Sequence, residues 1–446
     1  MSLAVNSVQP TLFSIQSLNG ETTIDLTGSS SLLFLDYYED LLSPSIMLTA
    51  QIMSSVSIIN VLPIRGGENV ELSIETAFGT FDFQGENALY VYKVSNINQD
   101  SNAETFTLNL VSREALTNET VRCLKRYDGT IDQSVSKILK DILKTNKFKQ
   151  DNIEKTTNSY SFIGNQKKPF HLLTWLGPKS IPQQSASATN TSGKDTTAKA
   201  KGVAGFLFYE NRDGFNFKSV ESLVKNTQFG TSNSKDIPKY YYKQVIEANS
   251  ALNEYTILNY NFDKNTDLLK NLRVGMYSNA TYFYNLYENR LSIISYNLKD
   301  EIKNSGTLGG DSNVAVSDEL GKSISRIMIR TSDIGVMDNK SGGASILDTT
   351  PMRDETDMAK STSRYNLLFT QSLNMVVPCN INLKVGDVIY AEFPRIRTSD
   401  KRDADDQQSG NYLIKELRHH MEPSMMVTSL KLIRDSYGLY SSLNNV

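Results

Sequence analysis

The sequence contains few of the residues that build metal centres and disulfide frameworks. Its 446 residues include 2 cysteines, 3 histidines and 1 tryptophan. Cys123 and Cys379 lie far apart and form no CxxC motif or Cys/His cluster, which argues against a structural zinc site and against a disulfide framework. We therefore expect two buried free thiols, and neither a metal nor any other cofactor.

An excess of positive charge and long apolar runs are also lacking. The 46 Lys and Arg residues are balanced by 49 Asp and Glu residues, and no long basic block occurs, which argues against a dedicated nucleic-acid surface. No segment approaches the apolar length of a membrane helix, and the first residues lack the basic and apolar regions of a secretory signal. These features predict a soluble protein without a membrane anchor, made in a cytoplasm.

Catalytic motifs are equally scarce. His171, His419 and His420 have no partner at a spacing typical of a catalytic or metal site. The aspartates within 400–406 lack the central glycine and final glutamate of a calcium loop, and "RGGENVE" lacks the Gly-Lys-Ser/Thr of a phosphate loop. We predict no catalytic, cofactor-binding or metal-binding residue, and a protein that is not an enzyme.

The periodicity of the chain predicts a mostly β protein with α-helical portions. Short β-branched and aromatic runs separated by Gly, Asn, Asp or Pro predict an antiparallel β domain up to about residue 119. The pattern then becomes helical: "GTIDQSVSKILKDILKT" predicts an amphipathic helix from about residue 131, with Thr130 and Gln133 as a capping box. "KKPFHLLTWLGP" predicts a second helix that begins near Pro169 and stops at Gly177. From about residue 361 to the C-terminal region the pattern is again that of β-strands.

The two β regions share a pattern that predicts an internal duplication. A Gly-acidic turn and an apolar run occur in "RGGENVELSIE" at 65–75 and again in "LKVGDVIYAEF" at 383–393. Each is followed by an apolar strand and a Thr/Ser-Leu-x-Leu strand, so that 89–94 aligns with 412–417 and 107–111 with 429–433. Strand patterns resemble one another by chance, but a shared order of elements favours two related domains. The residues that we expect to be structural in these domains are Gly66, Gly67, Val70, Leu108, Leu110, Gly386, Val388, Leu430 and Leu432.

Several stretches resemble the central baseplate hub protein of contractile-tailed bacteriophages, a family related to the hub portion of type VI secretion spikes. They are "LPIRGGENVEL", "KKPFHLLTWL", "GFLFYENRDGFNFKSVESL", "VPCNINLKVGDVIYAEFP" and "GNYLIKELRHHMEPSMMVTSLKLIRDSYG". The resemblance implies an α+β, mostly β fold with two similar antiparallel, barrel-like tube domains and α-containing domains inserted between and around them. It implies a first tube domain at 1–119, a second one split between 206–239 and 361–435, and a peripheral α+β domain at 120–205 and 240–305. Residues 306–360 are expected to form a loop-rich insertion and 436–446 a tail.

The resemblance also implies a function. Three copies would form a homotrimer whose six tube domains make a pseudo-six-fold ring, which joins the hexameric tail tube to the trimeric cell-puncturing spike. The implied partners are that spike, the tail tube or tube-initiator protein, baseplate wedge proteins and the tape measure protein, with DNA passing through the channel only transiently. The protein would be located in the virion after assembly in the host bacterial cytoplasm. The alternative is a glycan-binding or cell-wall-degrading phage tail protein, with exposed tyrosines as sugar platforms.

Overall fold

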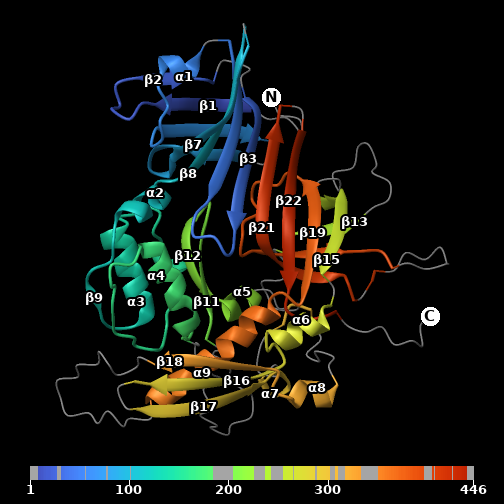
Figure 1. Ribbon diagram of the computed structural model, residues 1–446. Coiled ribbons are helices and arrows are strands. Elements are labelled where there is room, and N and C mark those ends of the chain that lie inside the picture. The colour runs from blue at the N-terminus through green and yellow to red at the C-terminus, as the bar shows by residue number, and fades with distance from the viewer. Residues whose placement is uncertain are drawn as a thin grey trace, which may run out of the picture.

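The protein is described here from a computed structural model. The structure describes residues 9–27, 32–55, 57–76, 79–100, 102–183, 204–225, 237–242, 255–264, 266–286, 289–301, 307–309, 317–332, 350–395, 404–405, 407–423 and 425–438. Most of the strands join one continuous, largely antiparallel sheet that runs through two β units, and helices and smaller sheets lie beside and below it (Figure 1).

The first β unit is built from the N-terminal strands. They are β1 (Gln9–Gln16), β2 (Thr23–Asp25), β3 (Leu32–Asp40), β4 (Met47–Ser54), β5 (Asn69–Thr76), β6 (Gly79–Phe83), β7 (Leu89–Gln99) and β8 (Glu104–Ser112). Along the sheet they follow the order β3-β4-β8-β7-β5-β1-β2, while β6 pairs with β5. The short helix α1 (Ile58–Val61) and the 3-10 turn η1 (Gly85–Asn87) lie in its connections.

The second β unit repeats this order with strands from later in the chain. They are β13 (Lys239–Tyr242), β14 (Thr256–Ile257), β15 (Asn259–Lys264), β19 (Gln371–Pro378), β20 (Val388–Glu392), β21 (Gly410–Glu422) and β22 (Met425–Arg434). The antiparallel order β15-β19-β22-β21-β20 matches β3-β4-β8-β7-β5 strand for strand. The predicted fold class, with two similar antiparallel β units, is therefore confirmed. At the edges the units differ, because β13 runs parallel to β20 whereas β1 runs antiparallel to β5.

The register repeats as well as the order. Val91, Lys93 and Val94 of β7 pair with Leu110, Asn109 and Leu108 of β8, so that the intervening Tyr92 is an extra residue in the ladder. Ile414, Glu416 and Leu417 of β21 pair in the same way with β22, and Lys415 is the extra residue. A one-residue bulge at corresponding positions is a specific feature of strand pairing. It supports descent of both units from one duplicated unit.

One apolar core spans both units. It includes 0% exposed residues from each sheet, such as Leu72 and Phe106 in the first and Leu373 and Phe393 in the second. The units are also joined edge to edge, since β3 of the first pairs with β21 of the second. The two β units therefore share one core and one sheet.

An α-containing portion with its own core packs beside the first unit. Its elements are α2 (Arg113–Thr120), β9 (Arg126–Tyr127), α3 (Ile131–Lys137), a π-helical turn (Ile138–Ile142), 3-10 turns (Gln150–Asn152 and Gly177–Lys179), β10 (Phe162–Ile163), α4 (Pro169–Leu176) and the hairpin β11 (Phe206–Asn211) and β12 (Gly214–Ser219). The helix α5 (Val220–Lys225) follows the hairpin, and its buried apolar residues, like Leu207 and Tyr209 of β11, belong to the core of the β units. The two predicted helices begin at Ile131 and Pro169, as expected. Thr130 is the N-cap of α3, but its side chain makes no capping hydrogen bond, so the predicted capping box is wrong.

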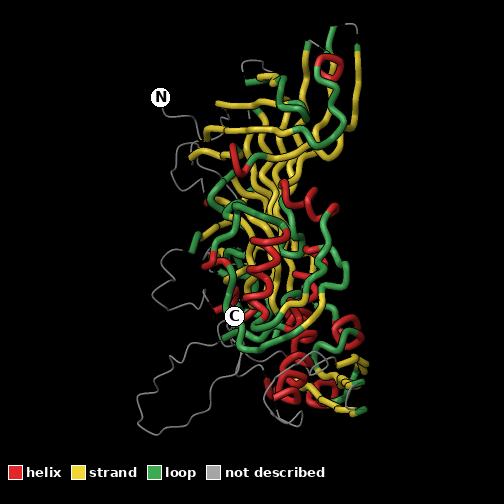
Figure 2. Tube along the Cα trace, turned by 90° about the vertical axis from the view of Figure 1, so that its left-hand side faces the viewer, coloured by secondary structure: helices red, strands yellow, loops and turns green. Residues whose placement is uncertain are grey.

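A third layer lies below the second unit (Figure 1). The three-stranded sheet has the order β17 (Arg290–Asn297), β16 (Ser278–Asn285), β18 (Arg326–Ser332), and α9 (Thr350–Leu367) packs on one face. The short helices α6 (Leu268–Arg273), α7 (Leu298–Glu301) and α8 (Asp318–Lys322) lie nearby. Figure 2 shows that the whole molecule is elongated along the axis that runs from the first unit to this layer.

Parts of the predicted domain division differ from the structure. Residues 206–219 were assigned to the second tube domain, but they form a separate two-stranded sheet. Residues 240–305 were assigned to the periphery, but β14 and β15 are strands of the second unit. The 306–360 insertion is not only loops, because it contains α8, β18 and the start of α9, and of the predicted tail only 436–438 lies within the described residues. The second β unit contains strands that are distant in sequence, and local strand patterns do not reveal which distant segments pair.

Candidate assembly site

The two Gly-acidic turns adopt the same structure. Gly67 has a φ of 97° and donates its N–H to the carbonyl of Val91 (2.6 Å), while the N–H of Val91 returns a bond to the carbonyl of Glu68 (3.0 Å). In the second unit Gly386 has a φ of 91° and donates to Ile414 (3.2 Å), and Ile414 donates to Asp387 (2.9 Å). Positive φ favours glycine because a side chain would clash with the backbone. The repeated sequence motif is therefore the turn that hydrogen-bonds to the neighbouring long strand, just before β5 pairs with β7 in the first unit and before β20 pairs with β21 in the second.

The acidic residue of each turn caps the turn backbone. The carboxylate of Glu68 accepts hydrogen bonds from the N–H groups of Arg65 (2.7 Å) and Gly66 (2.9 Å). The carboxylate of Asp387 accepts one from the N–H of Lys384 (3.2 Å), and burial raises the pKa of Asp387 to about 6. An acidic side chain next to the glycine thus satisfies backbone donors that the turn leaves unpaired.

The residues predicted to be structural all fall within the two β units. Gly66 (φ 106°), Gly67 and Gly386 lie in the turns. The apolar ones are at most 6% exposed and belong to the shared core: Val70, Leu108, Leu110, Val388, Leu430 and Leu432. Leu108 corresponds to Leu430 and Leu110 to Leu432 in the strand registers. Their assignment to a ring remains a prediction.

The junction between the units is a strand pair with a charged cluster. The second half of β21 pairs antiparallel with β3, with Arg418 opposite Tyr38 and His420 opposite Asp36. The guanidinium of Arg418 donates two hydrogen bonds to the carboxylate of Asp36 (2.9 and 2.8 Å), which also lies 2.6 Å from Nδ1 of His420. Asp36 is 4% exposed, whereas the side chain of Arg418 is 42% exposed, so the buried carboxylate holds a partly solvent-exposed guanidinium in a bidentate pair that favours this register of the two strands.

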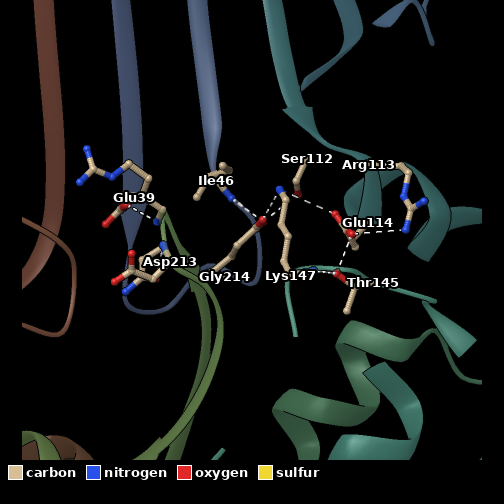
Figure 3. Close-up of polar contacts among 12 residues, drawn as sticks. Glu39, Ile46, Ser112, Arg113, Glu114, Thr145, Lys147, Asp213 and Gly214 are labelled. Atoms are coloured by element: carbon tan, nitrogen blue, oxygen red, sulfur yellow. Dashed lines mark hydrogen bonds and ion pairs between the residues drawn. The ribbon is translucent and has the colours of Figure 1, made fainter. Parts of the chain in front are cut away.

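Glu39 connects three parts of the chain at this junction, and Figure 3 shows it beside Asp213 of the β11–β12 turn. Its carboxylate accepts hydrogen bonds from the Tyr37 hydroxyl (2.7 Å), from the N–H of Arg212 in the β11–β12 turn (2.8 Å) and from the N–H of Val385 in the second Gly-acidic turn (2.8 Å). Burial raises the pKa of Glu39 to about 7, although these donors oppose the shift. One side chain thus ties the first unit, the hairpin and the second unit together.

A second buried carboxylate holds the α-containing portion against the first unit. Glu210, on β11, is 0% exposed and lies 2.9 Å from Nζ of Lys147. It also accepts hydrogen bonds from the Ser112 hydroxyl (2.7 Å) and the N–H of Ile46 (3.2 Å). Lys147 lies 3.9 Å from Glu114 as well, so one ammonium group faces two buried carboxylates (Figure 3). Burial raises the pKa of Glu210, and the nearby Lys147 opposes that shift.

His419 should make the junction sensitive to acid. It is 1% exposed, packs against Tyr37 and Phe81, and has its pKa lowered to about 3 by burial. Because the unfolded residue has a pKa of about 6.5, its contribution is complete above pH 6.5 and is lost as the pH falls. We expect acidification from pH 7.5 to pH 5 to lower the free energy of unfolding by about 2 kcal/mol through this residue.

The measurement is urea unfolding of three chains at both pH values. Glu39 and Asp387, whose pKa values are raised, act in the opposite direction in all three chains, so the comparison with the parent isolates the histidine. Between pH 7.5 and pH 5, His419→Phe should lose about 2 kcal/mol less stability than the parent, whereas His171→Phe, at an exposed position of α4, should behave like the parent. Equal acid sensitivity of all three chains would show that another group controls this range.

The sequence did not reveal the buried charges. Glu39, Glu210 and Lys147 occur in ordinary strand and loop contexts, and the only signal was a glutamate inside the otherwise apolar run "FLFYEN". Among the described residues, no group of three or more His, Cys, Asp or Glu side chains is placed to hold a metal ion. Both cysteines are free and buried, as predicted. No helix of the described chain has the length and apolarity needed to span a bilayer.

Comparison with known proteins identifies a sequence relative. The chain is 23% identical over 327 residues to the probable baseplate hub protein gp334 of Vibrio phage KVP40, which covers 68% of this chain and 66% of the relative. In sequence, the chain resembles a phage baseplate hub protein. The resemblance predicted from the motifs is thereby confirmed, over just under two thirds of the relative's length. No protein-family model matches the chain.

Solved structures that align with this chain come from phage tails and a secretion system. A prophage MuSo2 43 kDa tail protein from Shewanella oneidensis aligns over 95% of this chain and 98% of its own, with 8% identity and a TM-score of 0.47. A tail protein from Neisseria meningitidis aligns over 95% and 96%, with 9% identity and a TM-score of 0.49. The E. coli c3393 protein, a component of the type VI secretion system, aligns over 93% and 76%, with 12% identity and a TM-score of 0.43.

Proposed function

We propose that this chain is a structural hub of a contractile phage tail baseplate. The observation that carries the proposal is the repeated β unit, because two units with one strand order are joined edge to edge in a single chain. The similarity to a phage baseplate hub protein supports it. In this function the chain has a structural and not a catalytic role within the virion.

The proposed assembly is a homotrimer. Three chains with two units each present six similar faces around a channel, so that the trimer adapts a six-fold tail tube to a three-fold spike. Duplication resolves the difference in symmetry between tube and spike, because a trimer of duplicated chains has exact three-fold symmetry and, through its six similar units, approximate six-fold symmetry. The partners in this proposal are the trimeric cell-puncturing spike, the tail tube or tube-initiator protein, wedge proteins and the tape measure protein, while DNA passes through the channel.

The test of this proposal is the mass of the purified chain by light scattering over a range of concentrations. We expect a mass three times the 49.9 kDa of the chain, because an obligate ring of this kind buries more than about 2,000 Å² per interface. A monomer at every concentration, with or without the purified spike, would contradict the hub. A monomer that binds peptidoglycan or polysaccharide would instead support the glycan-binding alternative.

A further inference from the structure

The junction inside the chain shows how one β unit recognises another. In each unit the shared strand order begins at one edge with β3 or β15, and the second half of the long strand β7 or β21 forms another edge. Inside the chain, β3 of the first unit covers Glu416 to Met421 of β21 in the second. This pairing uses β3 of the first unit and β21 of the second. Among the described strands, the second half of β7 in the first unit and β15 in the second have no such partner.

The uncovered half of β7 corresponds in position to the covered half of β21. The shared bulge aligns Tyr92 with Lys415 and Ser95 with Arg418. Lys415 is 8% exposed beneath β3, whereas Tyr92 is 45% exposed, and Ile97 further along β7 is 53% exposed. Within the part of the chain that the structure describes, β7 pairs only with β8 and, at its first two residues, with β5. Among the described residues, the outer backbone edge of the second half of β7 therefore has no strand partner, and the ladder with β8 is irregular between Ser95 and Asn98, where Asn96 has a φ of 52°.

The second open edge belongs to β15. The registers with β4 and β19 align Tyr38 of β3 with Lys264 of β15, and Asp36 with Asn261. In the described residues β15 pairs with β19 on one side only. It thus occupies in the second unit the place that β3 occupies in the first, but none of the described strands pairs with its outer side.

These two edges lie far apart along the sheet. The path between them runs β15-β19-β22-β21-β3-β4-β8-β7, so six strands separate them, and Figure 1 shows β15 and β7 on different sides of the molecule. An open edge with unpaired N–H and C=O groups is a template for another strand. Because the edges differ, pairing between copies is head-to-tail, which produces a ring when the rotation closes.

We propose that the second half of β7 pairs antiparallel with β15 of a second copy, with Ser95 opposite Lys264. This inference rests on the proposed hub function and specifies its contact between subunits. The contact corresponds to the β3–β21 junction up to Ser95, beyond which β7 is irregular, so that units alternate around the ring through one junction inside a chain and one between chains. The inter-chain junction lacks counterparts of Arg418 and Asp36, since Ser95 and Asn261 occupy those positions. Backbone hydrogen bonds and the apolar surface of Tyr92 and Ile97 hold it together.

Disulfide trapping tests the register. Directly opposite residues of an antiparallel pair have Cα atoms about 4.5–5.5 Å apart, within the range that a disulfide spans. The variant carries Ser95→Cys and Lys264→Cys, and mild oxidation should link most copies covalently, as seen on a non-reducing gel. Either single variant and the parent chain, whose Cys123 and Cys379 are buried, should give almost no such product.

The control for the method is the equivalent pair inside the chain. Tyr38→Cys with Arg418→Cys should form a disulfide within one chain and run as a monomer. If the chain has trimeric mass and the control pair oxidises, but Ser95→Cys and Lys264→Cys do not link copies, the edge pairing is wrong and the hub function stands. If the chain has monomeric mass throughout, the hub function itself fails and this inference fails with it.

A point variant tests the same edge without cysteine. Ile97→Asp places a charge in the proposed contact, and we expect it to weaken association of the copies at least tenfold without changing the urea midpoint of the dissociated chain. Ile163→Asp is the matched control, because Ile163 is also a strand residue and is 52% exposed, but it lies in β10. Equal association of both variants would overturn the proposal.

Discussion

Leu432→Asp should unfold the second β unit and abolish assembly. Leu432 is 0% exposed, lies in β22 between β19 and β21, and belongs to the core that both units share. An unpaired carboxylate in such a site has no compensating partner, so we expect a loss of at least about 4 kcal/mol in the free energy of unfolding. Urea unfolding and light scattering measure the two parts of this expectation.

Two matched variants show whether the two units are equivalent. Leu110→Asp changes the corresponding residue of the first unit and should be as harmful, because Leu110 is also 0% exposed. Lys431→Asp changes the neighbouring residue, whose side chain is 37% exposed and whose ion pair with Glu416 spans 3.8 Å, so its effect should stay within about 1 kcal/mol. A Leu432→Asp chain with the parent's midpoint and mass would place this strand outside the core.

Local sequence patterns predicted the duplicated elements correctly. The alignment of 89–94 with 412–417 and of 107–111 with 429–433 corresponds to structurally equivalent strands with the same bulge. The alignment was detectable because the turn before β5 or β20 needs a glycine at positive φ followed by an acidic residue that caps the backbone. These two requirements produce the same short motif at Gly67 and at Gly386. Constraints of this kind act within a few residues and are visible in one sequence.

The remaining strands of the repeat could not be found in this way. The counterpart of β3 is β15, which is separated from β19 by more than a hundred residues containing a whole sheet and helix. β15 alternates between exposed polar and half-buried aromatic residues, whereas most of β3 is buried or half-buried, because β3 is covered by β21 and β15 is an edge. Corresponding strands in different environments lose their resemblance, so the pattern at Asn261 and Phe262 gave no sign of its relation to Asp36 and Tyr37.

The buried charge cluster was invisible for a related reason. Lys147, Glu114 and Glu210 come from three separate segments, and only the folded chain brings their side chains together (Figure 3). Charged residues are mostly exposed, so their sequence context predicts a solvated position unless a partner is known. The cluster nevertheless decides how the hairpin β11–β12 is fixed between the α-containing portion and the two β units.

Lys147→Met should destabilise the attachment of the β11–β12 hairpin, because it removes the positive charge that faces two buried carboxylates. The side chains of Lys147, Glu114 and Glu210 are 7%, 2% and 0% exposed, so removal of the ammonium group leaves two carboxylates buried close together. Breaking a buried ion pair on one side typically costs about 3–5 kcal/mol, because the remaining charge is neither solvated nor paired. We expect a loss of this size in the free energy of unfolding at pH 8, measured with urea.

Two measurements separate the effect of the Lys147 charge from the effect of its alkyl-chain packing: the pH dependence of Lys147→Met stability, and a second substitution at Glu210. Burial already raises the pKa of Glu210, and without Lys147 it should rise further, so the folded variant takes up a proton as the pH falls and regains stability towards pH 5. Lys147→Met combined with Glu210→Gln removes the unpaired charge while an amide oxygen still accepts from Ser112 and Ile46. The double variant should therefore be more stable than Lys147→Met at pH 8, and its stability should change with pH as that of the parent chain does. If the double variant is as unstable as Lys147→Met at pH 8 and at pH 5, Lys147 stabilises the fold through the packing of its alkyl chain and not through its charge.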